Sequence, residues 1–179
     1  MKFAAFFRNL NLGRARAPTK AQFEDAFRAA GAANAASFLV NGTMAFEATS
    51  RRRALQIVRA ACTAMHASCG LVEPAFIRSL DALAALVASD PFQAVDRSTV
   101  YACCVTFLHD DLVLPDEPPL ANSRKNVEVI AYTAAEMLSV AHQFGSSPGS
   151  PNLFAEKAFG LPATTRAWST VCRLVQRHG

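Results

Sequence analysis

Apolar and polar positions in the first half of the chain alternate between the spacing of strands and the spacing of helices. The short apolar run Phe3–Phe7 predicts a buried strand. Pro18-Thr19 opens a helix with apolar residues at helical spacing, and Gly31 ends it. Ser37–Val40 predicts a second strand, and Asn41-Gly42 is a strong signal for a two-residue hairpin turn.

The alternation continues after the hairpin. Met44–Phe46 predicts the returning strand, and Thr49-Ser50 caps a long helix that closes at Gly70. Leu71–Ile77 predicts a fourth strand, which Pro74 places at a sheet edge. The order strand, helix, strand, strand, helix, strand is that of a ferredoxin-like split βαβ arrangement.

The second half contains similar segments. Val100–Leu108 is the best predicted strand because its side chains alternate between two faces. Met137–Phe144 fits a strand or a helix equally well. Thr164 or Thr165 caps a final helix whose apolar stripe includes Trp168. The other expected elements are a helix over Leu80–Val87, a strand over Val127–Tyr132 and a helix over Leu153–Phe159.

These elements predict an α+β protein of two ferredoxin-like (βαββαβ-type) halves, each with helices packed on an antiparallel sheet. We expect residues 1–90 to form the first half, and residues 99–179, with the C-terminal helix, to form the second. Asp90–Ser98 is the best candidate for the boundary. No Gly- or Ser-rich linker separates the halves, so we expect them to share one compact unit.

Composition favours a folded chain with few constraints on its partner. Hydrophobic residues make up 51% of the 179 residues and charged residues 18%, which is enough to bury a sizeable core. The net charge of +4 permits contact with anionic metabolites or nucleic acid without demanding either. The run Arg51-Arg52-Arg53 is a candidate nucleic-acid contact and equally a solvated helix start. A free sheet edge is a candidate surface for homo-oligomer formation.

No segment resembles a targeting or membrane sequence. Phe3–Phe7 is shorter than the apolar stretch of a signal peptide, and no stretch has the ~18 apolar residues of a membrane helix. The five cysteines lack the spacing of a disulfide framework, which indicates reduced thiols. We therefore expect a cytoplasmic protein without membrane contact.

Three segments carry a resemblance to a known family. Phe7–Gly13 is similar to the motif Leu-Arg-Gly-Ile-Asn-Val-Gly, and Phe38–Phe46 is similar to the hairpin Tyr-Ile-Gln-Ser-Gly-Asn-Val-Val-Phe. Ala163–Leu174 gives the most specific match, to Ala-Thr-Ala-Arg-Asn-Trp-Asn-Thr-Val-Thr-Lys-Leu. Over essentially its whole length the chain resembles the family called domain of unknown function 1697. The resemblance implies an α+β fold of ferredoxin-like halves and no established activity.

The chain departs from the family motifs mainly at polar positions. Asn9 stands where the family has Gly, and Asn41 and Thr43 replace Ser and Asn. Ala167 and Ser169 replace two Asn residues. If the polar residues of the family form a site, the resemblance implies that the site in this chain is weakened or altered.

Three arginines are the best candidates for a binding site: Arg8, where a strand meets a loop, Arg78, and Arg166, expected in the first turn of the last helix. A cation is disfavoured at a helix start, so Arg166 needs a carboxylate partner or an anionic ligand. Two interpretations stay open: an ion pair of Arg166 with a nearby Asp or Glu that holds the halves together, or a site for a phosphate-containing or other anionic small molecule centred on Arg8 and Arg166. Further hydrogen bonds would come from Asn9, Asn11, Thr164 and Thr165.

No segment has the spacing of a catalytic or cofactor-binding motif. The chain has no Gly-x-Ser-x-Gly elbow, no Walker loop and no Cys-x-x-Cys pair. His109-Asp110-Asp111 is better explained as a solvated turn than as a metal site, because adjacent side chains point in different directions. We expect no catalytic residue, no metal and no cofactor, and hence a non-enzymatic or weakly ligand-binding protein.

Overall fold

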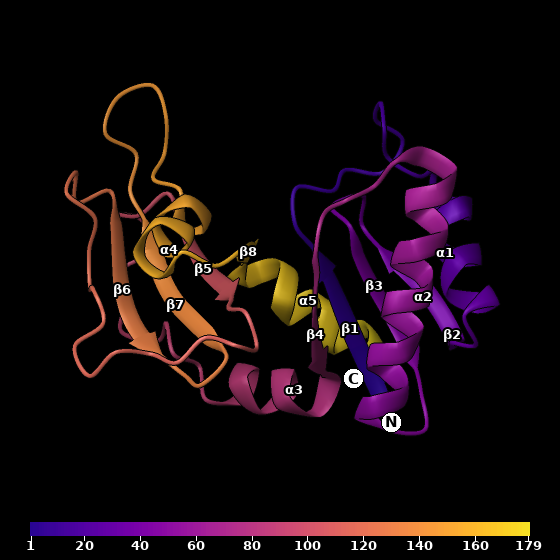
Figure 1. Cartoon of the computed structure of the whole chain (residues 1–179). Coiled ribbons are helices and arrows are strands. Elements are labelled where there is room, and N and C mark those ends of the chain that lie inside the picture. The colour runs from indigo at the N-terminus through magenta and orange to yellow at the C-terminus, as the bar shows by residue number, and fades with distance from the viewer. The chain divides into compact units, whose positions relative to one another are not determined.

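The computed structural model describes residues 1–179, which fall into two compact units. The first unit comprises Met1–Leu83 with Gln176–Gly179, and the second comprises Ala84–Val175. Each unit contains a four-stranded antiparallel sheet with helices packed on it (Figure 1). The predicted α+β class with two similar halves is confirmed.

The first unit has the element order of a ferredoxin-like half. Its strands lie in the order β2-β3-β1-β4, and every neighbouring pair is antiparallel. In chain order its elements are β1 (Lys2–Phe7), α1 (Lys20–Ala29), β2 (Ala33–Phe38), β3 (Thr43–Glu47), α2 (Arg51–Cys69) and β4 (Ala75–Ser79). The next helix, α3 (Leu80–Ala88), begins in the first unit and continues into the second.

Local signals set the ends of the first two helices. Thr19 and Gln22 form a capping box, in which Gln22 N donates to Thr19 Oγ1 at 3.3 Å and Thr19 N donates to Gln22 Oε1 at 2.8 Å. Ser50 Oγ accepts from Arg53 N at 3.1 Å at the start of α2. Gly70 follows α2 with a φ of 74°, in the left-handed region that favours glycine. The predicted starts of both helices and the stop of α2 are confirmed.

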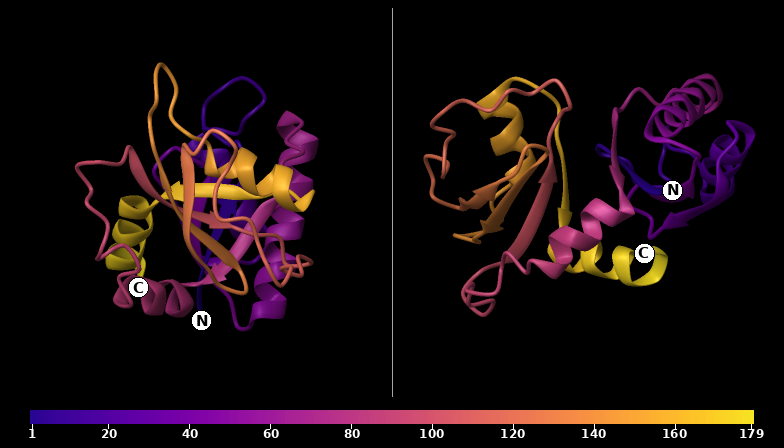
Figure 2. Two further views of the ribbon diagram at one scale, coloured as in Figure 1. Left: turned by 90° about the vertical axis from the view of Figure 1, so that its left-hand side faces the viewer. Right: turned by 90° about the horizontal axis from the view of Figure 1, so that it is seen from below.

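Aromatic side chains fill the core between one face of this sheet and the helices α1 and α2, which Figure 2 shows on the same side of the strands. Phe3, Phe7 and Phe46 of the strands meet Phe23 and Phe27 of α1, and all five side chains are at most 2% exposed. The ring centroids of Phe7 and Phe23 lie 5.2 Å apart, edge to face. Burial of each such side chain contributes about 1.5–3 kcal/mol, so this cluster dominates the stability of the unit.

The predicted hairpin, with its turn at Asn41-Gly42 and its returning strand at Met44–Phe46, is confirmed, but its first strand was placed too late. β2 spans Ala33–Phe38 and not Ser37–Val40, and Leu39–Gly42 connects it to β3. Leu39 has a φ of 58° and Val40 is 66% exposed, so neither residue continues the strand. The alanine-rich start of β2 lacks the β-branched and aromatic residues typical of strands, and for this reason the pattern placed the strand too late.

The second unit repeats the strand order of the first. Its sheet has the order β6-β7-β5-β8, so in both sheets the sequence of strands is second, third, first, fourth. In chain order the elements are β5 (Ala102–Phe107), β6 (Val127–Tyr132), β7 (Glu136–Ala141), α4 (Pro151–Phe159), β8 (Thr164–Ala167) and α5 (Trp168–His178). Residues 108–126 form no helix, so this half lacks the counterpart of α1. The ambiguous segment Met137–Phe144 contains the strand β7.

The predicted start of the last helix is also wrong. Thr164 and Thr165 do not cap α5 but lie in β8, and the helix begins at Trp168. The reason is that β8 pairs with β5 up to the residue that directly precedes the helix. Arg166 therefore lies in a strand and not in the first turn of a helix.

The helix α4 covers one face of the second sheet. A buried cluster joins them, with the ring of Tyr132 in β6 6.0 Å from that of Phe159 in α4. The members of this cluster are Leu108, Val129, Met137, Ala155 and Ala163. None of the helices of the protein combines the length and the apolarity that crossing a membrane requires.

Candidate functional site

Arg8 directly follows β1 and is held by a carboxylate. Its Nη1 donates to Glu73 Oε2 at 2.8 Å, and the two side chains are 25% and 27% exposed. Asn9 is exposed and has a φ of 49°, which Asn tolerates better than most residues. Asn11 is exposed as well. Arg8 therefore forms a structural ion pair with Glu73.

Arg78 and Arg166 are buried side chains of edge strands. Arg78 in β4 is 5% exposed, and its Nη1 donates to Ile77 O at 2.9 Å. Arg166 in β8 is 7% exposed, and its Nη1 donates to Thr164 Oγ1 and to Thr165 O, each at 2.9 Å. Burial lowers the pKa of Arg166 to about 10, which still leaves the guanidinium protonated at neutral pH.

The two buried arginines occupy equivalent positions in the two halves. Each lies in the fourth strand of its half, two residues before the first residue of the following helix. Arg78 pairs with Ala4 of β1, and Arg166 pairs with Val105 of β5. Because side chains alternate along a strand, both arginines project from the sheet face opposite to α1 and α2 or to α4. The sequence showed two similar segments, Ile77–Leu80 and Thr165–Trp168, but this equivalence was missed.

The predicted site residues divide between the two units. The first unit holds Arg8, Asn9, Asn11 and Arg78, and the second holds Thr164, Thr165 and Arg166. Within the second unit Thr164 and Arg166 are joined by a hydrogen bond. The hydroxyl of Thr165 lies instead 2.8 Å from that of Thr106. An anion site centred on Arg8 and Arg166 stays a prediction.

The basic run at the start of α2 has a structural role at one of its three positions. Arg53 Nη2 donates to Ala30 O, which ends α1, at 3.1 Å. Gly31 provides the space for this contact, because a Cβ there would lie 2.6 Å from Arg53 Nη2. Arg51 and Arg52 are exposed. Arg53 is therefore engaged within the protein, and the nucleic-acid interpretation of the run stays a prediction.

Two of the thiols are held in the protonated form. Burial raises the pKa of Cys62 to about 11 and that of Cys104 to about 12, so both thiols are protonated at neutral pH. His66 Nδ1 lies 3.2 Å from Leu71 O. No three side chains of His, Cys, Asp or Glu come together in a group that could hold a metal ion.

A pocket of about 470 Å³ in the second unit brings together two cations without any carboxylate. Arg124 comes from the turn before β6, and Lys157 comes from α4. Neither forms an ion pair or a side-chain hydrogen bond. The pocket is lined by Asn122, Ser123, Arg124, Asn126, Pro148, Ser150, Leu153, Phe154 and Lys157.

Hydrogen bonds and one glycine fix the walls of this pocket. Asn122 Oδ1 accepts from Asn126 N at 3.0 Å and from Val127 N at 3.2 Å, and Asn122 Nδ2 donates to Asn126 Oδ1 at 2.7 Å. These bonds hold the turn that carries Arg124. A Cβ at Gly149 would lie 1.8 Å from Asn126 O, so only glycine lets the segment before α4 approach the turn this closely. The pocket could not be foreseen from the sequence, because its residues come from two segments that are distant along the chain, residues 122–126 and 148–157.

The sequence profile described as "Protein of unknown function (DUF1697)" matches residues 1–138 of the chain. The chain belongs to the DUF1697 family. No curated protein matches it. This match confirms the family that the sequence motifs resemble, and it covers the motifs at Phe7–Gly13 and Phe38–Phe46 but not the one at Ala163–Leu174.

A solved structure agrees with the fold of this DUF1697 protein. It is "The structure of conserved bacterial protein SP0830 from Streptococcus pneumoniae", with a TM-score of 0.65 and 14% sequence identity. The similarity covers 99% of this chain and 98% of the other. At this identity the similarity concerns the fold alone.

One departure from the DUF1697 motifs falls at a helix end. The residue before α5 is Ala167, where the family motif has Asn. Asn is a strong N-cap residue because its side chain accepts a hydrogen bond from the first turn, whereas Ala has no such acceptor. Ala167 therefore provides no side-chain cap for α5, whereas the motif that Ala163–Leu174 resembles would provide one.

Proposed function

We propose that this DUF1697 protein is a non-enzymatic cytoplasmic protein that binds an anionic small molecule in the pocket of its second unit. One observation supports the proposal: the only charged groups of the lining are the cations Arg124 and Lys157. A carboxylate or phosphate would form charge-assisted hydrogen bonds with both, and no acidic side chain of the lining would oppose it.

The rest of the lining suggests the second part of the ligand. Pro148, Leu153 and Phe154 form an apolar wall beside the two cations. The volume of about 470 Å³ lies within the range of pockets for small organic molecules. The ligand that suits this lining has an anionic group joined to an apolar or aromatic part.

The lining also favours binding over catalysis. It contains no carboxylate, imidazole or thiol, the groups that most often transfer protons or attack a substrate. The hydroxyls of Ser123 and Ser150 have no base in the lining to activate them, and Ser150 Oγ accepts from Leu153 N at 3.4 Å as the cap of α4.

Phenyl phosphate tests the proposal, with inorganic phosphate and phenol as its two halves. We expect calorimetry to detect phenyl phosphate binding more tightly than either half. Arg124→Gln and Lys157→Gln should each lower the affinity for phenyl phosphate by about tenfold, because a hydrogen bond to a charged group contributes roughly 1.5–3 kcal/mol.

Lys125→Gln is the matched control, because Lys125 belongs to the same turn as Arg124 but does not line the pocket. Absence of binding, or equal losses in all three variants, would contradict the proposal.

The arginine site predicted from the sequence is a second proposal for the same class of ligand. Arg166 favours it as a buried cation, two of whose acceptors are the neutral atoms Thr164 Oγ1 and Thr165 O. Arg166→Lys keeps the charge but loses the planar donor geometry. If phenyl phosphate binding falls in Arg166→Lys and stays unchanged in Arg124→Gln, the site lies at Arg166 and the pocket proposal is wrong.

A further inference from the structure

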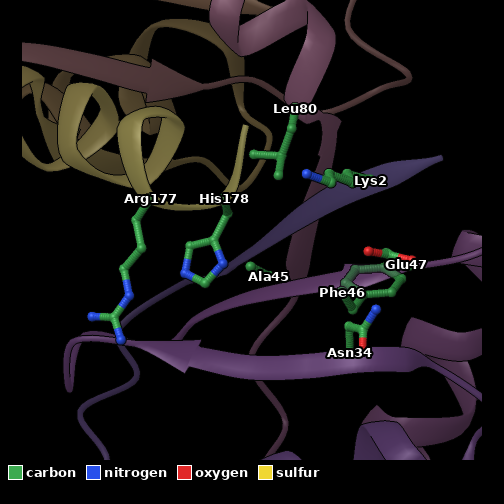
Figure 3. A pocket seen from close by; sticks show the side chains of 8 residues that line it. All are labelled: Lys2, Asn34, Ala45, Phe46, Glu47, Leu80, Arg177 and His178. Atoms are coloured by element: carbon green, nitrogen blue, oxygen red, sulfur yellow. The ribbon is translucent and has the colours of Figure 1, made fainter.

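A second pocket, of about 240 Å³, lies at one end of the sheet of the first unit (Figure 3). The start of β1, the end of β3, the start of β2 and the last turn of α5 meet there. The pocket is lined by Lys2, Asn34, Ala45, Phe46, Glu47, Leu80, Arg177 and His178. This site is in the other unit and has a different chemistry from the anion pocket.

Several polar groups of this lining have no partner. The side chains of Asn34, Glu47 and Arg177 form no hydrogen bond or ion pair. His178 Nε2 is buried and has no hydrogen-bond partner. A buried polar atom without a partner costs about 1–3 kcal/mol, and a ligand that hydrogen-bonds to it removes this cost.

Apart from Lys2, which lies opposite Glu47 in the pairing of β1 and β3, the charges of the lining are separated along the pocket. In Figure 3 the carboxylate of Glu47 and the amide of Asn34 lie on one side, and Arg177 and His178 lie on the other. Lys2 Nζ is already engaged, because it donates to Gly179 O at 2.9 Å. The groups open to a ligand are therefore an anion at one end and a cation at the other.

The backbone at Asn34 departs from the regular strand at this pocket. The register of β2 and β3 shifts between Ala33 and Ala36, which marks a bulge, and Asn34 has a φ of 48°. A bulge redirects a side chain out of the regular alternation of a strand. Here the redirected side chain is the amide of Asn34, which joins the lining on the side of Glu47.

We infer that this pocket binds a free α-amino acid with an apolar side chain. Glu47 and Asn34 would hold the ammonium group, and Arg177 would hold the carboxylate in a bidentate pair. The apolar residues of the lining are Ala45, Phe46 and Leu80, which form the wall beside the charged groups. The two ends of the pocket match the two charges of one small zwitterion, and neither a simple anion nor a simple amine satisfies both.

His178 suits this role in its neutral form. Burial, then the positive charges of Arg177 and Lys2, lower the pKa of His178. The imidazole is therefore neutral at pH 7, and its buried Nε2 can hydrogen-bond to a ligand without adding a charge.

Three probes with one carbon skeleton test the inference. L-Leucine carries both charges, 4-methylpentanoate lacks the ammonium group, and 3-methylbutylamine lacks the carboxylate. We expect calorimetry to give an affinity for L-leucine at least about tenfold higher than for either single-charge probe, the gain expected from one further charge-assisted hydrogen bond.

Two variants assign each charge to its end of the pocket. Glu47→Gln should lower the affinity for L-leucine by about tenfold and leave the affinity for 4-methylpentanoate unchanged. Arg177→Gln should lower the affinity for L-leucine by the same factor and leave the affinity for 3-methylbutylamine unchanged. Arg52→Gln and Glu117→Gln, exposed and outside the pocket, are the matched controls. Thermal unfolding of every variant shows whether the fold is kept.

Three outcomes would overturn the inference. They are no binding of L-leucine below about 10 mM, equal affinities for L-leucine and 4-methylpentanoate, and binding of L-leucine that neither pocket variant weakens. None of them bears on phenyl phosphate binding to the other unit, so the two proposals fail separately.

Discussion

At the scale of single residues, the hydroxyls of Thr106 and Thr165 form a polar pair inside the second sheet. Their oxygens lie 2.8 Å apart, and Thr106 is fully buried. If one hydroxyl is removed, the other stays buried without a hydrogen-bond partner, which costs free energy. If both are removed, no buried polar group is left without a partner. We expect Thr165→Val to lower the free energy of unfolding by about 1–3 kcal/mol.

The double variant Thr106→Val/Thr165→Val should recover most of that loss. Chemical denaturation of the parent, both single variants and the double variant completes the cycle. Additive losses would show that the two hydroxyls do not act as a pair.

The sequence identified individual arginines but not their surroundings. Arg166 was expected to need a partner because a cation is disfavoured at a helix start, and Arg8 was a candidate because it lies where a strand meets a loop. Their contacts depend on strand register, which places Arg78 beside Ala4. A single sequence does not contain that register, because residues distant along the chain determine it.

At the scale of elements, the last helix lacks a cap that the other helices have. Each of α1, α2 and α4 begins after a hydroxyl residue whose oxygen accepts a backbone N–H, and these caps are Thr19, Ser50 and Ser150. Ala167 precedes α5 and offers no acceptor. We expect Ala167→Asn, which restores the residue of the family motif, to raise the free energy of unfolding by about 0.5–2 kcal/mol.

Ser169→Asn is the control for this prediction. It restores the other asparagine of the motif, but position 169 lies inside the first turn of α5 and cannot cap it. Denaturant midpoints measure both changes, and an equal gain from the two variants would exclude capping as the cause.

Elements with strong local signals were predicted correctly, and elements set by pairing were not. The capping residues and the glycines that follow the helices predicted the bounds of α1 and α2. The alternation of side chains between two faces predicted the strand β5. The early start of β2 was missed because its alanines are weak strand formers. The strand β8 was missed because Thr164 and Thr165 were interpreted as helix caps. For the same reason the pockets were not foreseen, since each joins side chains from several elements.

At the scale of the whole molecule, the last turn of α5 belongs to the first unit and gives its stability a pH dependence. The ring of His178 lies 6.0 Å from that of Phe38 in β2. Burial, Arg177 and Lys2 lower the pKa of His178 in the folded state. The unfolded state therefore binds a proton more readily, so stability is full above the unfolded pKa, roughly 6.5, and falls as pH drops below it.

His178→Gln removes the titrating group, so the free energy of unfolding of the variant should depend less on pH below about pH 6.5. Denaturant unfolding between about pH 7.5 and pH 5, in the parent and the variant, measures the difference in slope. A parent whose stability rose as the pH fell, relative to the variant, would show that the imidazole gains an anionic partner in the folded state.

The missing counterpart of α1 in the second half bears on how relatives of this chain can diverge. Residues 108–126 connect β5 to β6 without a helix, and the end of this connection supplies the turn of Arg124. Irregular backbone tolerates insertions and exchanges of residues far better than a helix packed on a core. Among DUF1697 proteins with this architecture, ligand preference should vary chiefly in this connection, while the paired strands beneath it change little.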